Sequence, residues 1–390
     1  MVILKLAVRN IIGAGLRTWL TVIVLSLSFV IIIWHKGLLD GWDRQAINDM
    51  ISWEVAGGQY WNEKYDPYDP LSLAESHNVI PFQIRNLIER GEASPFLFAQ
   101  GTVYPEGRLQ SIIIKGVDPE QDIIELPSEE LADADAEIPA IIGRNLSAST
   151  GLEEDDLVTL RWRDKNGAFD AAQVRIAGVF NTNVPSVDNG QIWIPLEVLR
   201  EMILAPGEAT IVVCRESETD YPEVEGWEFL SRDDLFTDLN EIIKSKTMAG
   251  LIIWAILLMV AMLAIFDTQV LSIFRRQKEI GTYIALGMTR WQVVSLFTIE
   301  GAMHSILATV LGALYGVPLL SIQATRGISL PVSTKDYGLA MAEKLYPVYS
   351  LALVAGTVIV VVLVTTLVSY WPSRKIARMK PTEALRGKIQ

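Results

Sequence analysis

The sequence contains few of the residues that carry metal, redox or nucleophilic chemistry. One cysteine and three histidines occur in 390 residues, so an internal disulfide is excluded, and Cys214 lies in an apolar run typical of a buried strand. P-loop, HExxH and GxSxG motifs are missing. The acidic stretch 119–140 lacks the Asp/Asn and Gly alternation of a calcium loop, which favours a solvated loop over a metal site. We therefore expect neither catalysis nor a metal site in this chain.

Charged residues are nearly absent from four long stretches, which predict membrane-spanning helices at 18–34, 247–274, 293–320 and 348–371. In the second, the uncharged residues 248–266 alone make a helix of about 28 Å, close to the hydrocarbon thickness of a bilayer. The first follows a basic leader and could instead be a signal peptide, but Trp34-His35-Lys36 offers no small-residue cleavage site. An uncleaved first span is the favoured interpretation.

Basic residues set the expected orientation. Thirteen Lys and Arg, against only Glu279 and Glu383, lie in the terminal segments 1–17 and 372–390 and in the loop 275–292. By the positive-inside rule these three pieces are cytoplasmic, and the opposite side holds residues 35–246 and the short loop 321–347. The sequence thus predicts a multi-pass inner-membrane protein with cytoplasmic N- and C-termini and a large periplasmic domain.

The segment 35–246 has 40 acidic and 17 basic residues, a net charge of −23, while the rest of the chain sums to +10. This acidity argues against nucleic acid as a partner. Its β-branched runs and helical patterns intermix, which predicts an α+β domain large enough to hold its own core. Strands are expected at 111–117, 157–163, 173–179, 191–194 and 210–214, and helices at 81–90, 195–203 and 231–244.

Two local signals refine the prediction for this domain. Ser231 and Asp234 have the spacing of a capping box at the start of the last helix. Residues 60–70 are rich in Tyr, Asp and Pro. They form either a packed Ω-like loop or a contact surface.

The predicted cytoplasmic loop, RRQKEIGTYIALGMTRWQ, is short, basic and helix-prone, and membrane spans hold it on both sides. Ile280, Ile284 and Leu286 can cover one side of a helix, while Gly281 and Gly287 permit close backbone approach and a C-terminal stop. Such a helix can sit in a groove on a soluble partner that pushes on the membrane protein. The alternative is an ordinary turn anchored by Arg and Lys.

Small residues recur at three- or four-residue spacing in the third span and give it one smooth face. In lipid such a face drives helix packing because backbones can touch. The face packs either within the subunit or across a dimer. Its members are Gly301, Ser305, Ala308, Gly312 and Gly316.

Ionisable residues inside spans are candidates for functional sites. Glu300 and His304 share a helix side, which would suit a proton relay or a metal pair, but we favour a structural hydrogen bond. Asp267 lies two turns from Arg275 and can pair with a cytoplasmic Arg or Lys.

Segments spread over nearly the whole chain resemble the permease subunits of type VII, or mechanotransmission, ABC transporters, the family of MacB, FtsX and LolC/LolE. Asp267 departs from this pattern, which more often has Asn. No fused N-terminal ATPase is seen, the outer domain is larger than in FtsX-type proteins, and four spans exclude ten-span permeases, so the chain looks most like a LolC/LolE-type permease. The matching segments are 4–11 with 16–21, 141–162, 174–180, 192–202, 275–293, the EG pair at 300–301, and PSRKIARMKPTEALRG at 372–387.

The resemblance implies a permease subunit without a cofactor of its own, which couples ATP hydrolysis by a separate ATPase, the subunit that binds ATP and Mg²⁺, to periplasmic movements. Lipoprotein release is the favoured task; a MacB-like efflux permease with a periplasmic adaptor and an FtsX-like signalling protein are alternatives. Implied partners are the ATPase, a second permease copy or paralogue, a carrier or adaptor, a lipoprotein or amphiphile, and membrane lipids. The implied ATPase-coupling residues are Arg276, Lys278, Glu279, Ile280, Gly281, Ala285, Leu286 and Gly287.

Cargo taken from the outer leaflet or the periplasm need not cross the bilayer through so few spans. The apolar outer halves of the first two spans then form a lateral opening for an acyl chain or amphiphile, and each buried side chain contributes about 1.5–3 kcal/mol. The alternative is lipid-facing spans with interfacial Trp anchors. The residues concerned are Phe29, Ile33, Trp34, Leu251, Trp254 and Leu258.

Overall fold

The computed structural model describes residues 16–132, 138–216, 221–329 and 344–374. Most of the predicted cytoplasmic termini, with their basic residues and the motifs at 4–11 and 375–387, lie outside these residues. The chain divides into a helical unit and a second compact unit, here called the β domain, which spans Arg44–Ile242. The sequence predicted slightly wider limits for that domain, 35 and 246.

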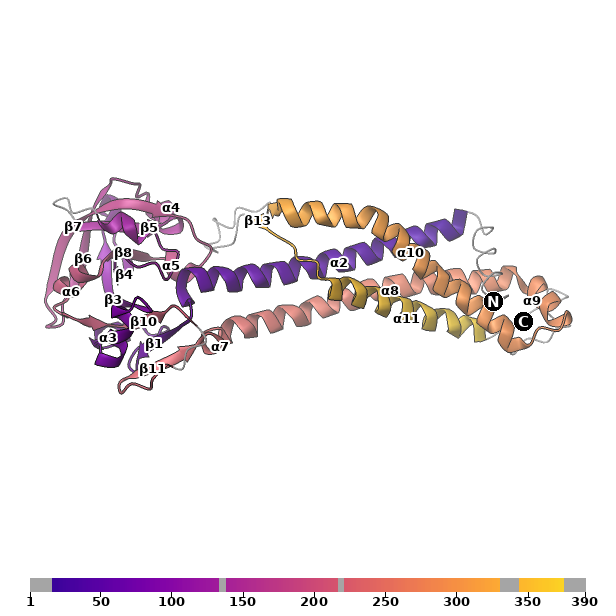
Figure 1. Ribbon diagram of the computed structural model, residues 1–390. Coiled ribbons are helices and arrows are strands. Elements are labelled where there is room, and N and C mark those ends of the chain that lie inside the picture. Colours follow the sequence, from indigo (N-terminus) through magenta and orange to yellow (C-terminus); the bar gives the residue numbers. More distant parts are fainter. Residues whose placement is uncertain (1–15, 133–137, 217–220, 330–343, 375–390) are drawn as a thin grey trace. The chain divides into compact units, whose positions relative to one another are not determined.

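Among its described residues the helical unit contains four helices long and apolar enough to span a membrane, one over each of the four predicted spans. The helices extend beyond the uncharged stretches because charged residues continue them: in the first, Lys36 and Asp40 form an i,i+4 ion pair at 2.8 Å. A short strand pair, β12 (Ile328–Ser329) with β13 (Lys344–Leu345), lies beyond the third. The four are α2 (Leu16–Met50), α8 (Thr237–Arg275), α10 (Arg290–Arg326) and α11 (Leu351–Ser373) (Figure 1).

An apolar cluster holds these four helices together. Leu25 and Phe29 of α2, Leu258 of α8, Ala308 of α10 and Val361 of α11 all belong to it and are buried. In lipid such contacts stabilise the bundle through close packing, since lipid tails are as apolar as the side chains.

The β domain is built on a nine-stranded sheet with the order β11-β1-β10-β3-β4-β8-β5-β7-β6 (Figure 1). Strand β3 also pairs with β6, so the six strands from β3 to β6 form a closed ring. The pairs β4–β8 and β5–β7 are parallel and the other pairs antiparallel. The strands are β1 (Gly58–Asn62), β3 (Ala93–Val103), β4 (Gln110–Val117), β5 (Ile138–Gly143), β6 (Leu157–Arg163), β7 (Phe169–Phe180), β8 (Gln191–Pro195), β10 (Ile211–Cys214) and β11 (Trp227–Ser231).

Every second side chain along these strands packs inside the closed ring. Along β6, Val158, Leu160 and Trp162 are buried while the residues between them are exposed, as expected when one face of a strand packs on a core. Leu196 and Leu199 of α6 belong to the same buried cluster. All five β-runs predicted from the sequence are confirmed as strands β4, β6, β7, β8 and β10.

Short helices cover the sheet and its connections. The predicted helices at 81–90 and 195–203 are confirmed as α3 and α6. The predicted helix at 231–244 starts with the expected capping box between Ser231 and Asp234, but it is divided at Phe236 into α7 and the start of α8. The elements are α3 (Phe82–Glu89), α4 (Arg144–Thr150), α5 (Pro185–Asp188), α6 (Leu196–Met202), α7 (Arg232–Leu235), the π-helix η1 (Ile51–Val55), the 3-10 turns η2 (Pro70–Ala74), η3 (Pro105–Gly107) and η4 (Ser128–Ala132), and the strand pair β2 (Asn78–Val79) with β9 (Glu208–Ala209).

The sequence predicted a loop or contact surface at residues 60–70, and this prediction is wrong for the first residues of the stretch. Tyr60 lies in β1, is fully buried, and donates its hydroxyl to the Pro222 carbonyl at 2.7 Å. Tyr65 packs its ring on Trp61, whereas Tyr68 is 78% exposed. The aromatic stretch therefore divides into a core strand and an exposed turn.

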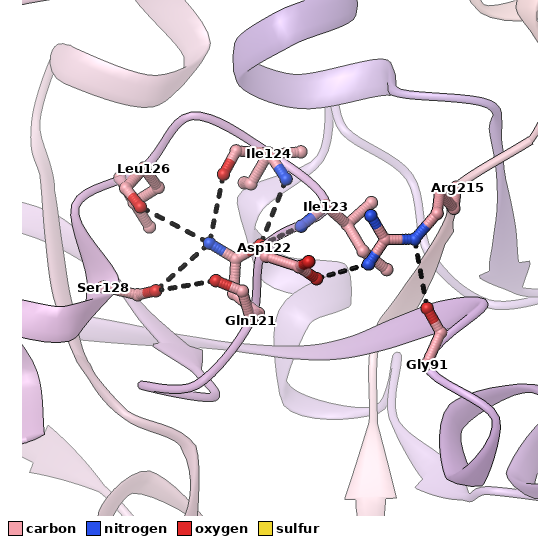
Figure 2. A network of polar contacts seen from close by, with 8 residues as sticks. All are labelled: Gly91, Gln121, Asp122, Ile123, Ile124, Leu126, Ser128 and Arg215. Carbon is pink, nitrogen blue, oxygen red and sulfur yellow. Dashed lines mark hydrogen bonds and ion pairs between the residues drawn. The ribbon is translucent and has the colours of Figure 1, made fainter.

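The acidic stretch 119–140 is held by more hydrogen bonds and ion pairs than the sequence predicted. The Gln121 amide donates to the Ile124 and Leu126 carbonyls at 3.2 and 3.4 Å, and its oxygen accepts from the Ile124 N–H at 3.1 Å (Figure 2). Asp122 forms an ion pair with Arg215 (Figure 2). Ile124 and Leu126 are buried in the core. Residues 119–132 thus form a surface loop whose apolar side chains pack inward, while its acidic side chains are exposed as expected. Residues 133–137 lie outside the described residues.

Candidate functional site

The loop between α8 and α10 folds into a short helix, α9 (Gln277–Ala285), between two breaks. Arg276 separates it from α8, with φ −101° and ψ 20°. After α9, Gly287 adopts φ +99°, a conformation that favours glycine and ends the helix as the sequence predicted. Thr289 then starts α10 through a capping box with Gln292.

Helix α9 buries one side and exposes the other. Ile280 is fully buried with Val293 and Phe297 of α10, and Ile284 packs against the same cluster. Leu286 follows the helix and is 79% exposed, so the three apolar residues expected on one side do not share it. Gly281 is buried against this side. The exposed surface consists of Lys278, Glu279, Thr282, Ala285, Leu286 and Gly287, all of them expected coupling residues except Thr282.

Arg276 ties the start of α9 to α10. Its Nε donates to Glu279 at 2.7 Å, and its Nη1 donates to the two carboxylate oxygens of Glu300 at 2.9 and 3.2 Å. The guanidinium also lies 4.9 Å from the centre of the Phe297 ring. The Glu300 side chain is only 6% exposed, so its charge needs this partner. Hydrophobic packing and a buried ion pair together fix α9 on α10.

Glu300 and His304 do not combine into a relay or a metal pair. The His304 Nδ1 donates to the backbone carbonyl of Glu300 at 2.6 Å, while the Glu300 carboxylate binds Arg276. Within the described residues no group of three His, Cys, Asp or Glu side chains is placed to hold a metal ion. His304 thus bonds within α10, whereas Glu300 bonds to Arg276 at the start of α9. Asp267 is exposed on α8 and forms no ion pair in the described part of the chain.

The small-residue face of α10 packs against helices of the same chain. A Cβ atom on Gly301 would lie 2.0 Å from the Ser369 Oγ of α11, and one on Gly316 would lie 2.8 Å from Val30 of α2. Side chains at these two points would force the helices apart. The other members of the face, Ser305, Ala308 and Gly312, are buried as well.

An apolar cavity of about 300 Å³ lies between α2, α8 and α11. Leu251 and Trp254 of α8, two residues of the expected lateral opening, line it together with Leu39 of α2 and with Leu353 and Gly356 of α11. Two walls of this cavity thus come from α2 and α8, the helices expected to form the lateral opening.

The other residues of the expected opening lie in the helix bundle. Phe29 and Leu258 belong to the buried cluster of the four helices, Ile33 is buried, and Trp34 is half-buried. The third wall, α11, was missed by sequence reasoning. Its signal was the small pair Ala352 and Gly356 at i,i+4 spacing, which leaves room beside a helix.

Four apolar helices, a large domain inserted after the first and an exposed short helix after the second define a multi-pass membrane protein of the permease type. Residues 251–381 match the family described as FtsX-like permease C-terminal. An uncharacterized ABC transporter permease of Methanocaldococcus jannaschii is 25% identical over 42% of this chain and 38% of its own length.

Two named transporter proteins are also similar. The lipoprotein-releasing system transmembrane protein LolC of Neisseria meningitidis is 23% identical over 75% of this chain and 77% of its own. The macrolide export ATP-binding/permease protein MacB of Sodalis glossinidius is 30% identical over 39% of this chain and 22% of its own. These similarities are to ABC transporter permeases of the FtsX, LolC and MacB type, the family that the sequence motifs indicated.

Proposed function

We propose that this chain is the membrane subunit through which a separate ATPase, on the cytoplasmic side, drives movements of the β domain on the other side of the inner membrane. The arrangement of α9 supports the proposal best. Its outer side is exposed, while Ile280 and the Arg276–Glu300 ion pair fix its inner side on α10. A force that the ATPase applies to α9 therefore displaces the spanning helix α10, because α9 is fixed to it.

The helix contacts give this push a route. Gly301 of α10 touches Ser369 of α11, and Gly316 touches Val30 of α2. Helix α2 then continues without a break to Met50, next to η1 and the first strand of the β domain. We propose that the ATPase acts on two permease copies, or on this chain and a paralogue, because four helices with one coupling segment cannot enclose a substrate path alone.

The proposed cargo is a lipoprotein or a similar amphiphile. The surface of the cavity between α2, α8 and α11 is mainly apolar, which suits an acyl chain. Its lining also includes His35, Lys36, Thr247 and Thr357. Release toward a periplasmic carrier is the favoured outcome, in keeping with the LolC similarity over three quarters of the chain. The identity with MacB proteins in part of the chain keeps amphiphile efflux through an adaptor as the second candidate.

Substitutions on the exposed side of α9 test the coupling proposal. We expect Glu279→Lys and Gly287→Val to reduce ATPase stimulation by about tenfold, since the first reverses a charge at the docking surface and the second strains a positive φ. The measurement is ATP hydrolysis by the ATPase that co-purifies with the chain in nanodiscs. Trp291→Ala, exposed at the start of α10, serves as the control. Undiminished stimulation in both variants would place the docking surface elsewhere.

Photo-crosslinkers at Leu251 and Trp254 test the cargo site. We expect both to capture a lipoprotein or amphiphile in cells, whereas a crosslinker at Leu263, exposed on α8 outside the cavity, captures bulk phospholipid. Gly356→Leu should lower capture about tenfold, or ~1.4 kcal/mol, because its side chain fills the cavity and meets no atom within 4 Å at its Cβ. Cargo captured at Tyr68 but not at Leu251 would contradict a site between the helices.

A further inference from the structure

Lys115 of β4 is a buried lysine that forms no ion pair with any described residue. It is only 7% exposed. Its direct neighbours on the adjacent strands are Phe98 of β3 and Trp193 of β8, and its Nζ lies 4.8 Å from the centre of each ring. Ring faces stabilise a cation, but lysine is almost never buried without a partner of opposite charge. This lysine therefore needs a further explanation.

The Lys115 amine points at the loop that contains α5. Its Nζ donates to the Ser186 carbonyl at 2.9 Å. Beside it, the Nε1 of Trp193 donates to the Val187 carbonyl at 3.0 Å. Two side chains of the sheet thus hold consecutive carbonyls of α5, which fixes this short element on the core of the β domain.

The end of α2 and the π-helix η1 contact the same loop from the other side. These residues belong to the β domain, which begins at Arg44. The Asn183 side chain donates to the Asp49 carboxylate at 3.0 Å, and the Ser186 hydroxyl donates to the Glu54 carboxylate. Ser186 therefore lies between two charges, with its carbonyl on Lys115 and its hydroxyl on Glu54.

The backbone of η1 depends on the contacts around it. The Trp53 ring stacks on Phe180 at 5.7 Å, and the Glu125 N–H donates to the Ser52 carbonyl at 2.8 Å. Ala56 ends η1 with φ +47° and ψ −117°, a conformation that costs energy for a residue with a side chain. A π-helical turn with a strained end persists only where its surroundings hold it. We therefore treat η1 as a segment docked on the β domain.

The docked segment and the loop beneath it have complementary charges. Asp49 and Glu54 bring two carboxylates to a surface that has the Lys115 cation beneath it. Burial lowers the pKa of the Lys115 amine to about 8, while the Glu54 carboxylate opposes this fall, so the amine is charged at neutral pH and attracted to η1. Arg232 contributes a second contact, from its Nε to the Ala56 carbonyl.

We infer that Lys115 is a positioning residue, whose buried charge keeps η1 and the end of α2 docked on the β domain by acting on Glu54 through Ser186. The inference rests on the proposed function for its role in transport, because α2 is the helix proposed to carry movement to this domain. Displacement of α2 then reaches the loop 182–189 and the sheet through this contact, and not only through the chain connection at β1.

Hydrogen exchange of the full-length protein in nanodiscs, without the ATPase, tests the docking. Lys115→Met keeps an unbranched side chain between the two rings and removes the charge. We expect amides of residues 49–57 to exchange about tenfold faster, or ~1.4 kcal/mol, in Lys115→Met and in Glu54→Gln, while β6 and β7 keep their rates. Lys165→Met, which removes an exposed lysine that pairs with Glu208, is the matched control and should change nothing at 49–57.

Combined variants separate a role of the charge from a role in packing. The double variant Lys115→Met/Glu54→Gln should exchange no faster at 49–57 than either single variant, because both remove the same interaction. Additive effects, unchanged exchange in Lys115→Met, or faster exchange throughout the β domain would each overturn the inference. Ser186→Ala, which removes the hydroxyl and keeps the carbonyl, should also accelerate exchange at 49–57, and wild-type rates there would exclude the bridge.

The same measurement with the co-purified ATPase tests the transport role. Adding ATP should change the exchange of residues 182–189 in the wild type but not in Lys115→Met, whose α9 is untouched. Equal ATP-dependent changes in both proteins would remove Lys115 from the path of the movement. No change in the wild type would contradict the proposed function instead, whereas the docking of η1 is decided by the experiments without the ATPase.

Discussion

Gly301→Ala is expected to separate α10 from α11 and to lower the thermal stability of the purified protein by several degrees. The added Cβ would lie 2.0 Å from the Ser369 Oγ and 2.4 Å from its Cβ, closer than packed atoms come. Ser369 is fully buried, and its hydroxyl donates to the Thr365 carbonyl at 2.7 Å. Overpacking of this kind costs about 1–3 kcal/mol. Loss of monodisperse protein on heating in detergent measures the effect.

The chain supplies a matched control and a rescue for this variant. Gly356→Ala adds the same methyl group to α11, where no atom lies within 4 Å of it, and should leave the melting point unchanged. Ser369→Gly combined with Gly301→Ala removes the clashing side chain and should restore most of the lost stability. If Gly301→Ala melts like Gly356→Ala, α10 and α11 do not pack as described.

Breaking the Arg276–Glu300 pair should uncouple the ATPase while leaving the protein in the membrane. Glu300→Ala leaves the Arg276 cation, only 20% exposed, without its main partner, and truncating one member of a buried pair costs about 3–5 kcal/mol. Detachment of α9 from α10 would expose Arg276 to water and so reduce this cost. We expect ATPase stimulation to fall to the level of the ATPase alone.

The neighbouring arginine separates this effect from loss of charge. Arg275 is exposed, so Arg275→Ala should keep most of the stimulation, whereas Arg276→Ala should lose it. Because the two groups act as a pair, the double variant Arg276→Ala/Glu300→Ala should be no worse than Glu300→Ala alone. Full stimulation by membrane-inserted Arg276→Ala would show that the pair has no part in coupling.

The sequence predicted those features that depend on neighbours along the chain. The four spans follow from runs without charge, and the start of α7 follows from Ser231 and Asp234, three residues apart. The turn after α9 follows from Gly287, whose φ of +99° favours a residue without a side chain. Each of these signals lies within one element, so no knowledge of packing was needed.

Features that depend on packing between elements were predicted poorly. Periodicity placed Ile280 and Ile284 on one side of a helix but could not say that this side faces α10. Arg276 and Glu300 are 24 residues apart and meet only because α10 folds back beside α9. Strand β3 was missed because Pro95 and Gly101 interrupt its apolar run, and tertiary pairing overrides those local signals.

The position of β1 and β11 decides which bonds of the β domain would carry a mechanical load. The two strands are antiparallel partners, and Gly58, after α2 and η1, pairs with Ser231, before α7 and α8. Tension between the two helices would therefore enter at this end of the β1–β11 pair. On its other side β1 is held by β10, which pairs with β3 of the closed ring. Under such tension we expect β11 to separate from β1 before the closed ring is deformed.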